Sequence, residues 1–345
     1  MICPELLTPQ LIVKGRFIFG NFFDMPREKA YLQFKEWADI YGPIFKLEIL
    51  GSTHVIVSSQ EIAEDLMAKK GAIYSDRGTL QMIKLVTGGR DLLASSSESE
   101  YWRLGRRFAA SMLTPTMAAQ WEPYQTSQCM RMVQSMMKEP ERYIYWLDRY
   151  ATLVSLKEIY GKKVTTVAEE EYHTRTISER MHNIERLGTP GGYLVELIPA
   201  LLKLPAWMTS FRAEAQALRD VELAYFQGLV EDAQQRWNEK ILETPESFAR
   251  CWLKKDNRWE LGKIDITYVL GTLYGGGSGT TSNAMQTFIM AMALYPEWQR
   301  KLQAELDDVV GSERLPSFAD RPHLRLVRAV AKEILRWRPV VPGSK

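Results

Sequence analysis

Two short segments near the start of the chain alternate between apolar and polar residues. In residues 44–50, Phe45 and Leu47 fall on one side of the alternation, which has the two-residue period of a half-buried strand. Residues 54–57 alternate again after Gly51-Ser52, a pair that favours a tight turn. The pattern therefore predicts a β-hairpin.

Most of the remaining chain has the 3.6-residue apolar period of amphipathic helices. Capping-box spacing of Ser58 with Glu61, and of Ser97 with Glu100, predicts the starts of two helices. The predicted fold is mainly α with a small β-sheet, in a single domain over residues 1–345. Further helices are predicted over residues 116–138, 141–160, 168–187, 211–240, 264–294 and 297–310, and between Arg321-Pro322 and Pro339.

An apolar stretch over residues 193–208 is interrupted by charged residues and prolines, among them Glu196 and Pro199. It is too short and too broken to cross a bilayer, so we expect it to cover a pocket or to contact a membrane surface. Residues 1–20 hold no long apolar run, and we therefore expect neither a signal peptide nor a membrane anchor there.

Composition narrows the function classes. The 345 residues are 46% apolar and 25% charged, as in ordinary globular proteins, and the formal net charge of +2 is too small to predict nucleic-acid binding. Three cysteines, Cys3, Cys129 and Cys251, lie far apart without a Cys/His cluster, which argues against a zinc site and against a disulfide framework. A reducing, intracellular setting fits this pattern.

Trp102 and Arg106 are four residues apart in a predicted helix, so their side chains share one face. An indole N–H beside a guanidinium is a donor pair suited to a carboxylate. Taken alone, the segment is better interpreted as a solvated basic face with one buried tryptophan.

Residues 275–279 contain four glycines within a helical pattern, at a cost of roughly 1 kcal/mol each relative to alanine. A phosphate cradle is a poor interpretation, because the P-loop lysine and its strand context are missing. Two interpretations remain open. Either the helix opens at its middle, so that a flat ligand approaches the backbone and the Thr280 hydroxyl, or the glycines permit a close helix–helix contact.

Glu333 and Arg336 are three residues apart in the last predicted helix and can form an ion pair. Their neighbours are largely apolar, so we expect the pair to be buried and to act as a structural clasp. An ordinary surface pair is the alternative, and it is the better interpretation of this segment alone.

These three segments, in this order, resemble those of the cytochrome P-450 family, and the resemblance extends over about residues 20–342. The E-x-x-R pair of the family matches residues 333–336, its oxygen-activation stretch matches residues 276–281, and its W-x-x-x-R helix matches residues 102–106. Other segments look like fungal members of secondary metabolism, of the O-methylsterigmatocystin oxidoreductase type; they are residues 20–26, 71–77 and 190–195.

The resemblance implies a haem-thiolate monooxygenase that contains haem b, receives electrons from NADPH-cytochrome P-450 reductase and acts on an apolar small molecule. It also implies roles for individual residues. Trp102, Arg106 and Gly276 would bind the haem, and Glu333 with Arg336 would clasp the segment that leads to the thiolate loop.

The catalytic residues that the resemblance implies are Gly277, Thr280 and Thr281, with Thr280 assisting proton delivery. Gly279 stands where the family usually carries an acidic residue, which weakens the expected proton relay. The implied location is the surface of the endoplasmic reticulum, or the cytosol because residues 1–20 match the family's anchor and hinge only in degenerate form.

The family's F-x-x-G-x-R-x-C-x-G loop lies beyond its E-x-x-R, and this chain ends at Lys345 with no cysteine in a replacing position. Cys251 lacks the surrounding glycines and is interpreted as an ordinary cysteine. We therefore expect no metal ligand, poor haem binding and no monooxygenase activity from this chain alone. The alternative function is a non-catalytic helical binding or interaction module. Residues 80–93 and 193–208 are expected to line or cover a pocket for a hydrophobic metabolite.

Overall fold

The computed structural model of the chain describes residues 13–17, 19–26, 29–78, 80–92, 96–188, 192–254 and 259–341. Cys3, residues 1–12 of the predicted N-terminal segment and residues 190–191 of the fungal-type segment lie outside them. The strands are β1 (Ile44–Ile49) and β2 (Ser52–Val57). The α-helices are α1 (Ala30–Tyr41), α2 (Gln60–Ala63), α3 (Gly71–Tyr74), α4 (Gln81–Thr87), α5 (Glu100–Met112), α6 (Pro115–Gln120), α7 (Glu122–Lys138), α8 (Tyr143–Tyr160), α9 (Val167–Gly188), α10 (Leu194–Leu197), α11 (Ser210–Asn238), α12 (Phe248–Leu253), α13 (Lys263–Leu294), α14 (Pro296–Val309) and α15 (Arg325–Trp337).

The predicted hairpin is present, and the mainly α fold with a small sheet is confirmed. Strands β1 and β2 pair antiparallel, with Phe45 opposite Ile56. Phe45 and Leu47 are fully buried, as the alternation predicts, and pack against α1. The turn lies one residue earlier than predicted, because Leu50 and Gly51 both adopt positive φ and Ser52 already belongs to β2.

The two predicted capping boxes are wrong in detail. Ser59, not Ser58, accepts a hydrogen bond from the Ile62 backbone N–H at the start of α2. Ser99, not Ser97, accepts from Trp102 N–H at the start of α5. In each case a serine one or two residues further along the chain takes the cap, a difference that sequence spacing resolves poorly.

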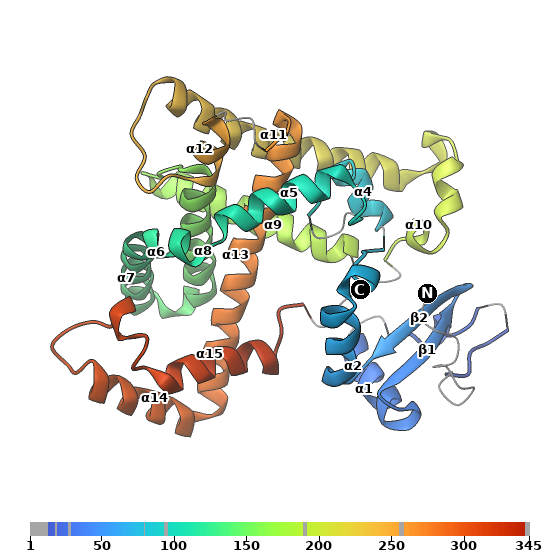
Figure 1. Ribbon diagram of the computed structural model, residues 1–345, viewed down its shortest axis with the longest axis horizontal. Coiled ribbons are helices and arrows are strands. Elements are labelled where there is room, and N and C mark those ends of the chain that lie inside the picture. The colour runs from blue at the N-terminus through green and yellow to red at the C-terminus, as the bar shows by residue number, and fades with distance from the viewer. Residues whose placement is uncertain are drawn as a thin grey trace.

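The long helix α13 is the axis of the molecule (Figure 1). It contacts α5, α8, α9 and α11 along its length, and α14 and α15 near its C-terminal end. Their large apolar side chains form one core, in which each fully buried member contributes about 1.5–3 kcal/mol relative to exposure. Core members from successive helices are Phe108, Leu156, Ile177, Phe226, Phe248 and Val269.

A smaller core joins segments that lie far apart in the sequence. Met82 and Val86 of α4 pack with Leu187 at the end of α9 and with Val195 of α10. Glu196 adds a polar connection, since its carboxylate accepts hydrogen bonds from Gln81 N–H and Met82 N–H at 2.8 and 2.7 Å. The apolar stretch of residues 193–208 is thus hydrogen-bonded, through Glu196, to the first turn of α4.

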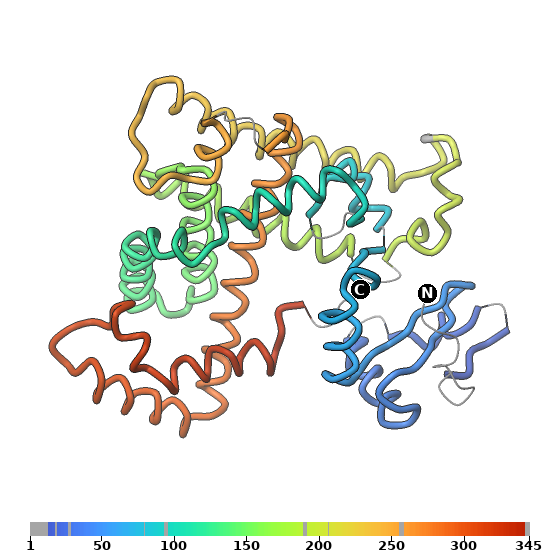
Figure 2. Tube along the Cα trace, viewed as in Figure 1, coloured from blue at the N-terminus to red at the C-terminus, as the bar shows by residue number. Residues whose placement is uncertain are grey.

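The N-terminal hairpin, with α1 and α2, stands to one side of the helical bundle, as the chain trace shows (Figure 2). Within the described ranges, no helix combines the length and the apolar character needed to span a bilayer. The arrangement leaves α5, α13 and α15 to carry the three sequence motifs.

Candidate functional site

The glycines of residues 275–279 lie within one continuous helix, so the expectation of a helix opened or broken at its middle is wrong. Cβ atoms at Gly275 and Gly277 would lie 2.6 Å from Arg180 Nη1 and from Ser155 Oγ. A Cβ at Gly279 would lie 3.1 Å from a side chain of α9. These three glycines permit the close approach of α8 and α9 to α13, which is the second of the two interpretations of this segment.

Gly276 lies on the side of α13 that does not contact these helices. No heavy atom lies within 4 Å of the position that its Cβ would occupy. Thr280, one turn later, is exposed, and its hydroxyl donates a hydrogen bond of 2.5 Å to the Gly276 carbonyl. Thr281 is exposed as well. The site residues predicted on α13 therefore separate into an open face, with Gly276 and Thr280, and a packed face that contains Gly277.

Trp102 and Arg106 share one face of α5, as their spacing predicts. The Arg106 guanidinium carbon lies 5.9 Å from the Trp102 ring centroid, and Arg106 is exposed. Gly105 holds α5 close to α13, since a Cβ there would lie 3.0 Å from a Val269 methyl group. The donor pair is thus positioned by a helix that packs directly on α13.

The Glu333–Arg336 pair is present but not buried. Arg336 Nε and Nη2 donate to the two Glu333 carboxylate oxygens at 2.7 and 2.6 Å. The two side chains are 54% and 72% exposed, so the expectation of a buried clasp is wrong for the described residues. Of this helix turn only Ile334 is buried, and the charged pair lies on the outer side of α15. The hydrogen bond to Arg336 lowers the pKa of the Glu333 carboxyl.

The two cysteines among the described residues lie on other helices than these motifs. Cys129 is exposed on α7, and Cys251 on α12 packs against the main core. In the part of the chain that the structure describes, no three His, Cys, Asp or Glu side chains are grouped as metal ligands.

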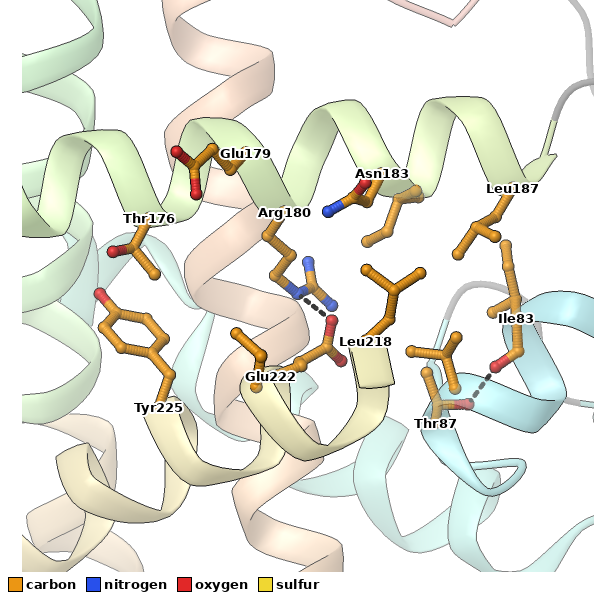
Figure 3. A pocket seen from close by; sticks show the side chains of 13 residues that line it. Ile83, Thr87, Thr176, Glu179, Arg180, Asn183, Leu187, Leu218, Glu222 and Tyr225 are labelled. Carbon is orange, nitrogen blue, oxygen red and sulfur yellow. Dashed lines mark hydrogen bonds and ion pairs between the residues drawn. The ribbon is translucent and has the colours of Figure 1, made fainter. Parts of the chain in front are cut away.

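A cavity of about 80 Å³ lies between α4, α9 and α11 (Figure 3). Arg180 and Glu222 cross it as an ion pair, with Arg180 Nε 2.9 Å from Glu222 Oε2 and both side chains 9% exposed. Its lining residues are Ile83, Val86, Thr87, Thr176, Glu179, Arg180, Asn183, Ile184, Leu187, Leu218, Val221, Glu222 and Tyr225. Of the described residues 80–92, Ile83, Val86 and Thr87 line this cavity, and none of the described residues 193–208 belongs to its wall.

Arg180 and Glu222 were not among the predicted site residues. A signal for both exists in the sequence, because each interrupts an apolar helical stripe. Arg180 follows Ile177 by three residues, and Glu222 precedes Phe226 by four, and both neighbours are buried. A charge within such a stripe is rare unless it is paired.

Next to the ion pair, polar groups of three aromatic side chains form a buried chain. His173 Nδ1 lies 2.8 Å from the Tyr225 hydroxyl, which lies 3.3 Å from the Tyr274 hydroxyl on α13. Burial lowers the pKa of His173 to about 4, so the imidazole is neutral near pH 7.

Comparisons with known proteins agree with these motifs. The chain matches the family described as Cytochrome P450 over residues 12–345. Cytochrome P450 monooxygenase 58 of Postia placenta is 34% identical over 330 residues, which are 95% of this chain and 62% of that protein. Cytochrome P450 monooxygenase COX2 of Coprinopsis cinerea is 31% identical over an alignment that covers 95% of this chain and 63% of that protein.

A cytochrome P450 monooxygenase of Armillaria gallica is 31% identical over 329 residues, with 95% of this chain and 62% of that protein covered. The chain belongs to the cytochrome P-450 family, of the fungal type, which confirms the resemblance seen in its motifs. Haem and a redox partner reductase are general to this family. The chain spans somewhat less than two thirds of the length of these curated relatives.

Proposed function

We propose that the function of this protein is the O2- and reductase-dependent hydroxylation or oxidation of an apolar metabolite in fungal secondary metabolism, an activity that these 345 residues do not perform by themselves. The observation that supports this most directly is the open face of α13. Gly276 and Thr280 leave one side of the central helix uncovered, while its other side is densely packed. A flat ligand approaches a helix backbone only where side chains leave such room.

The residues of this region fit haem b. Haem carries carboxylates, and Arg106 with the Trp102 indole N–H offers two donors on an accessible face of α5. When bound through a thiolate, haem supplies the family's oxidising chemistry. We propose Trp102, Arg106 and Gly276 as its contacts in this chain, with Glu333 and Arg336 as a clasp for the segment after α15.

Thr280 is proposed to hold a proton at Oγ1. Its hydrogen is directed to the Gly276 carbonyl, so the hydroxyl oxygen keeps its lone pairs available as acceptors. Rotation about one side-chain bond would turn the same hydrogen toward the open face. Thr281 and Gly277 are the other proposed catalytic positions, Thr281 through its exposed hydroxyl and Gly277 through its backbone.

Haem titration of the 345-residue polypeptide, followed by absorbance, tests this assignment. We expect Arg106→Leu to weaken haem binding by about tenfold or more, since it removes a charge-assisted hydrogen bond. Arg103→Leu, at another exposed position of α5, is the matched control and should leave haem binding unchanged. Equal haem affinity in the two variants would contradict the assignment.

The same polypeptide contains only Cys3, Cys129 and Cys251 as cysteines. We therefore propose that these 345 residues alone hold haem weakly and are inactive. Reduction under carbon monoxide should give no thiolate-type difference spectrum. A thiolate-type band, or product formed with O2 and a reductase, would contradict this proposal.

We also propose that residues 193–208 contact the surface of the endoplasmic reticulum membrane. Leu194, Trp207 and Met208 are 66%, 84% and 53% exposed, an unusual concentration of apolar side chains on one segment. Co-sedimentation with phosphatidylcholine vesicles should fall when Trp207→Ser is introduced. Val167→Ser, at a position 70% exposed on α9, is the control and should not change it.

A further inference from the structure

The cavity between α4, α9 and α11 contains a buried acceptor whose hydrogen-bonding capacity is not met. Glu222 Oε2 accepts from Arg180, but Oε1 is buried and has no hydrogen-bond partner among the described residues. A buried carboxylate oxygen without a donor is costly, and native proteins rarely leave one. The position of Oε1 therefore indicates that a donor from outside the chain belongs in the cavity.

The rest of the wall combines five polar side chains with six apolar ones, which are Ile83, Val86, Ile184, Leu187, Leu218 and Val221. Ile83, Leu187 and Leu218 lie on one side of the ion pair in Figure 3, and Thr87 directs its hydroxyl to the Ile83 carbonyl rather than to the cavity. The apolar side of the wall favours a hydrocarbon surface, and Glu222 supplies one fixed polar contact.

Charge selects among donors. The Arg180 guanidinium lies against Glu222 and neutralises it, so a cationic donor would be repelled by Arg180 and an anion by Glu222. Glu179 also belongs to the wall, but its side chain is 69% exposed and pairs with Arg175 at 3.7 Å, so solvent and Arg175 screen its charge. A neutral O–H satisfies Oε1 without adding a charge. This balance favours a hydroxyl over an ammonium or a carboxylate.

The size of the cavity sets how much of a ligand enters. Its volume of about 80 Å³ is smaller than an engineered cavity of about 150 Å³ that accepts benzene. Val221 belongs to the wall and is 68% exposed, so the cavity reaches the surface between α9 and α11. One end of a molecule can occupy the cavity while the remainder extends through this mouth.

We propose that this cavity binds the hydroxyl-bearing end of a neutral apolar molecule, whose O–H donates to Glu222 Oε1. This inference rests on the proposed function for its biological meaning, and it narrows the substrate class to apolar molecules that already carry a hydroxyl. A preceding reaction would then have to introduce or retain that group. The binding itself requires neither haem nor O2.

Isothermal titration calorimetry of the full chain, without haem, tests the proposal with 4-ethylphenol and ethylbenzene as probes. The two molecules differ by a single hydroxyl. We expect 4-ethylphenol to bind at least about tenfold more tightly, because a hydrogen bond to a charged acceptor is among the stronger ones. Equal affinities would overturn the proposal. So would absence of binding by both, the result expected if only water occupies the cavity.

Variants locate the site. Val221→Trp adds bulk at the exposed mouth and should abolish binding of 4-ethylphenol. Val167→Trp makes the same change at a position 70% exposed on α9 and outside the cavity wall, and it should bind like the wild type. Undiminished binding by Val221→Trp would place any site elsewhere and overturn the proposal.

A double variant, Arg180→Met with Glu222→Leu, removes both charges together and so leaves neither buried alone. We expect it to bind 4-ethylphenol and ethylbenzene with similar affinity. Retained preference for 4-ethylphenol would contradict the role of Oε1. Because these measurements need no haem, their failure and a failure of the haem titration are separate results.

Discussion

The two sides of α13 use glycine for opposite purposes. On the packed side, a Cβ at Gly271 would lie 2.5 Å from the Phe226 ring, and one at Gly277 would lie 2.6 Å from Ser155 Oγ. On the open side, a Cβ at Gly276 meets nothing within 4 Å. The same residue type brings helices together on one side and leaves a backbone uncovered on the other. What a glycine does in a helix thus depends on its neighbours in space.

Gly271→Ala is expected to have the largest effect on the packed side. The Phe226 ring is fully buried and cannot move aside freely. Overpacking typically costs about 1–3 kcal/mol, and alanine recovers about 1 kcal/mol of helix propensity. The approach of 2.5 Å is severe, so we take the upper part of the overpacking range, about 2–3 kcal/mol, and expect a net loss of about 1–2 kcal/mol in the free energy of urea unfolding. An unchanged unfolding free energy would show that the Phe226 ring can yield to the added methyl group.

Lowering the pH should reduce the free energy of unfolding through His173, which lies on α9 at the packed side of α13. Its pKa is about 4 in the fold, against an ordinary value of 6.5, because burial disfavours the charged imidazole. Between these two pH values the unfolded chain binds the proton and the folded chain does not, so stability falls as pH falls from 6.5 toward 4. The slope from this one proton is at most about 1.4 kcal/mol per pH unit.

His173→Gln keeps a polar group beside Tyr225 but removes the titration. Urea unfolding near pH 7 and near pH 5 should show a smaller loss of stability in this variant than in the wild type, because its folded state no longer excludes a proton. The other three histidines, His54, His182 and His323, are exposed and are present in both proteins. Their contribution to the pH dependence is therefore the same in the variant and the wild type. Equal losses in the two proteins would assign the pH dependence to other groups.

Gly276→Ala should have the opposite sign to Gly271→Ala. The added Cβ meets open space, and alanine is favoured over glycine inside a helix by about 1 kcal/mol. We expect the unfolding free energy to rise by about that amount. If the proposed haem contact is correct, the same variant should bind haem more weakly in the absorbance titration. A loss of stability would contradict an open face.

Glu333→Gln should have the smallest effect. The carboxylate and Arg336 are both largely exposed, so water replaces most of what the pair provides. We expect no resolvable change in the urea midpoint of this chain. A clear decrease would indicate that the pair is more constrained than its exposure suggests.

The motifs and most of the helix boundaries were predictable from local patterns. Gly161 adopts positive φ immediately after α8, and Gly311 does so just beyond α14, where the sequence places their ends. The pair of Trp102 and Arg106 on one helix face follows from their spacing alone. Helical periodicity and helix capping depend on residues that are close together in the sequence. Helix ends and shared helix faces can therefore be predicted without knowledge of the tertiary structure.

Other features depended on residues that are distant in the sequence. Glu333 has apolar neighbours along α15, yet its side chain is exposed, because burial is set by what packs against the helix. Glu222 is an ordinary helical glutamate in the sequence. Only the approach of α9, which brings Arg180 within 2.9 Å, makes it half of a buried pair with one unmet oxygen.

The amino-acid sequence by itself therefore determined the family, the helical fold class and the residues that carry its motifs, because these are encoded in local spacing and residue type. The tertiary structure alone decided which α13 glycines pack and which one stays open, and it created the cavity beside Glu222. Those outcomes arise from contacts between helices, and contact geometry is not contained in the period of any single helix.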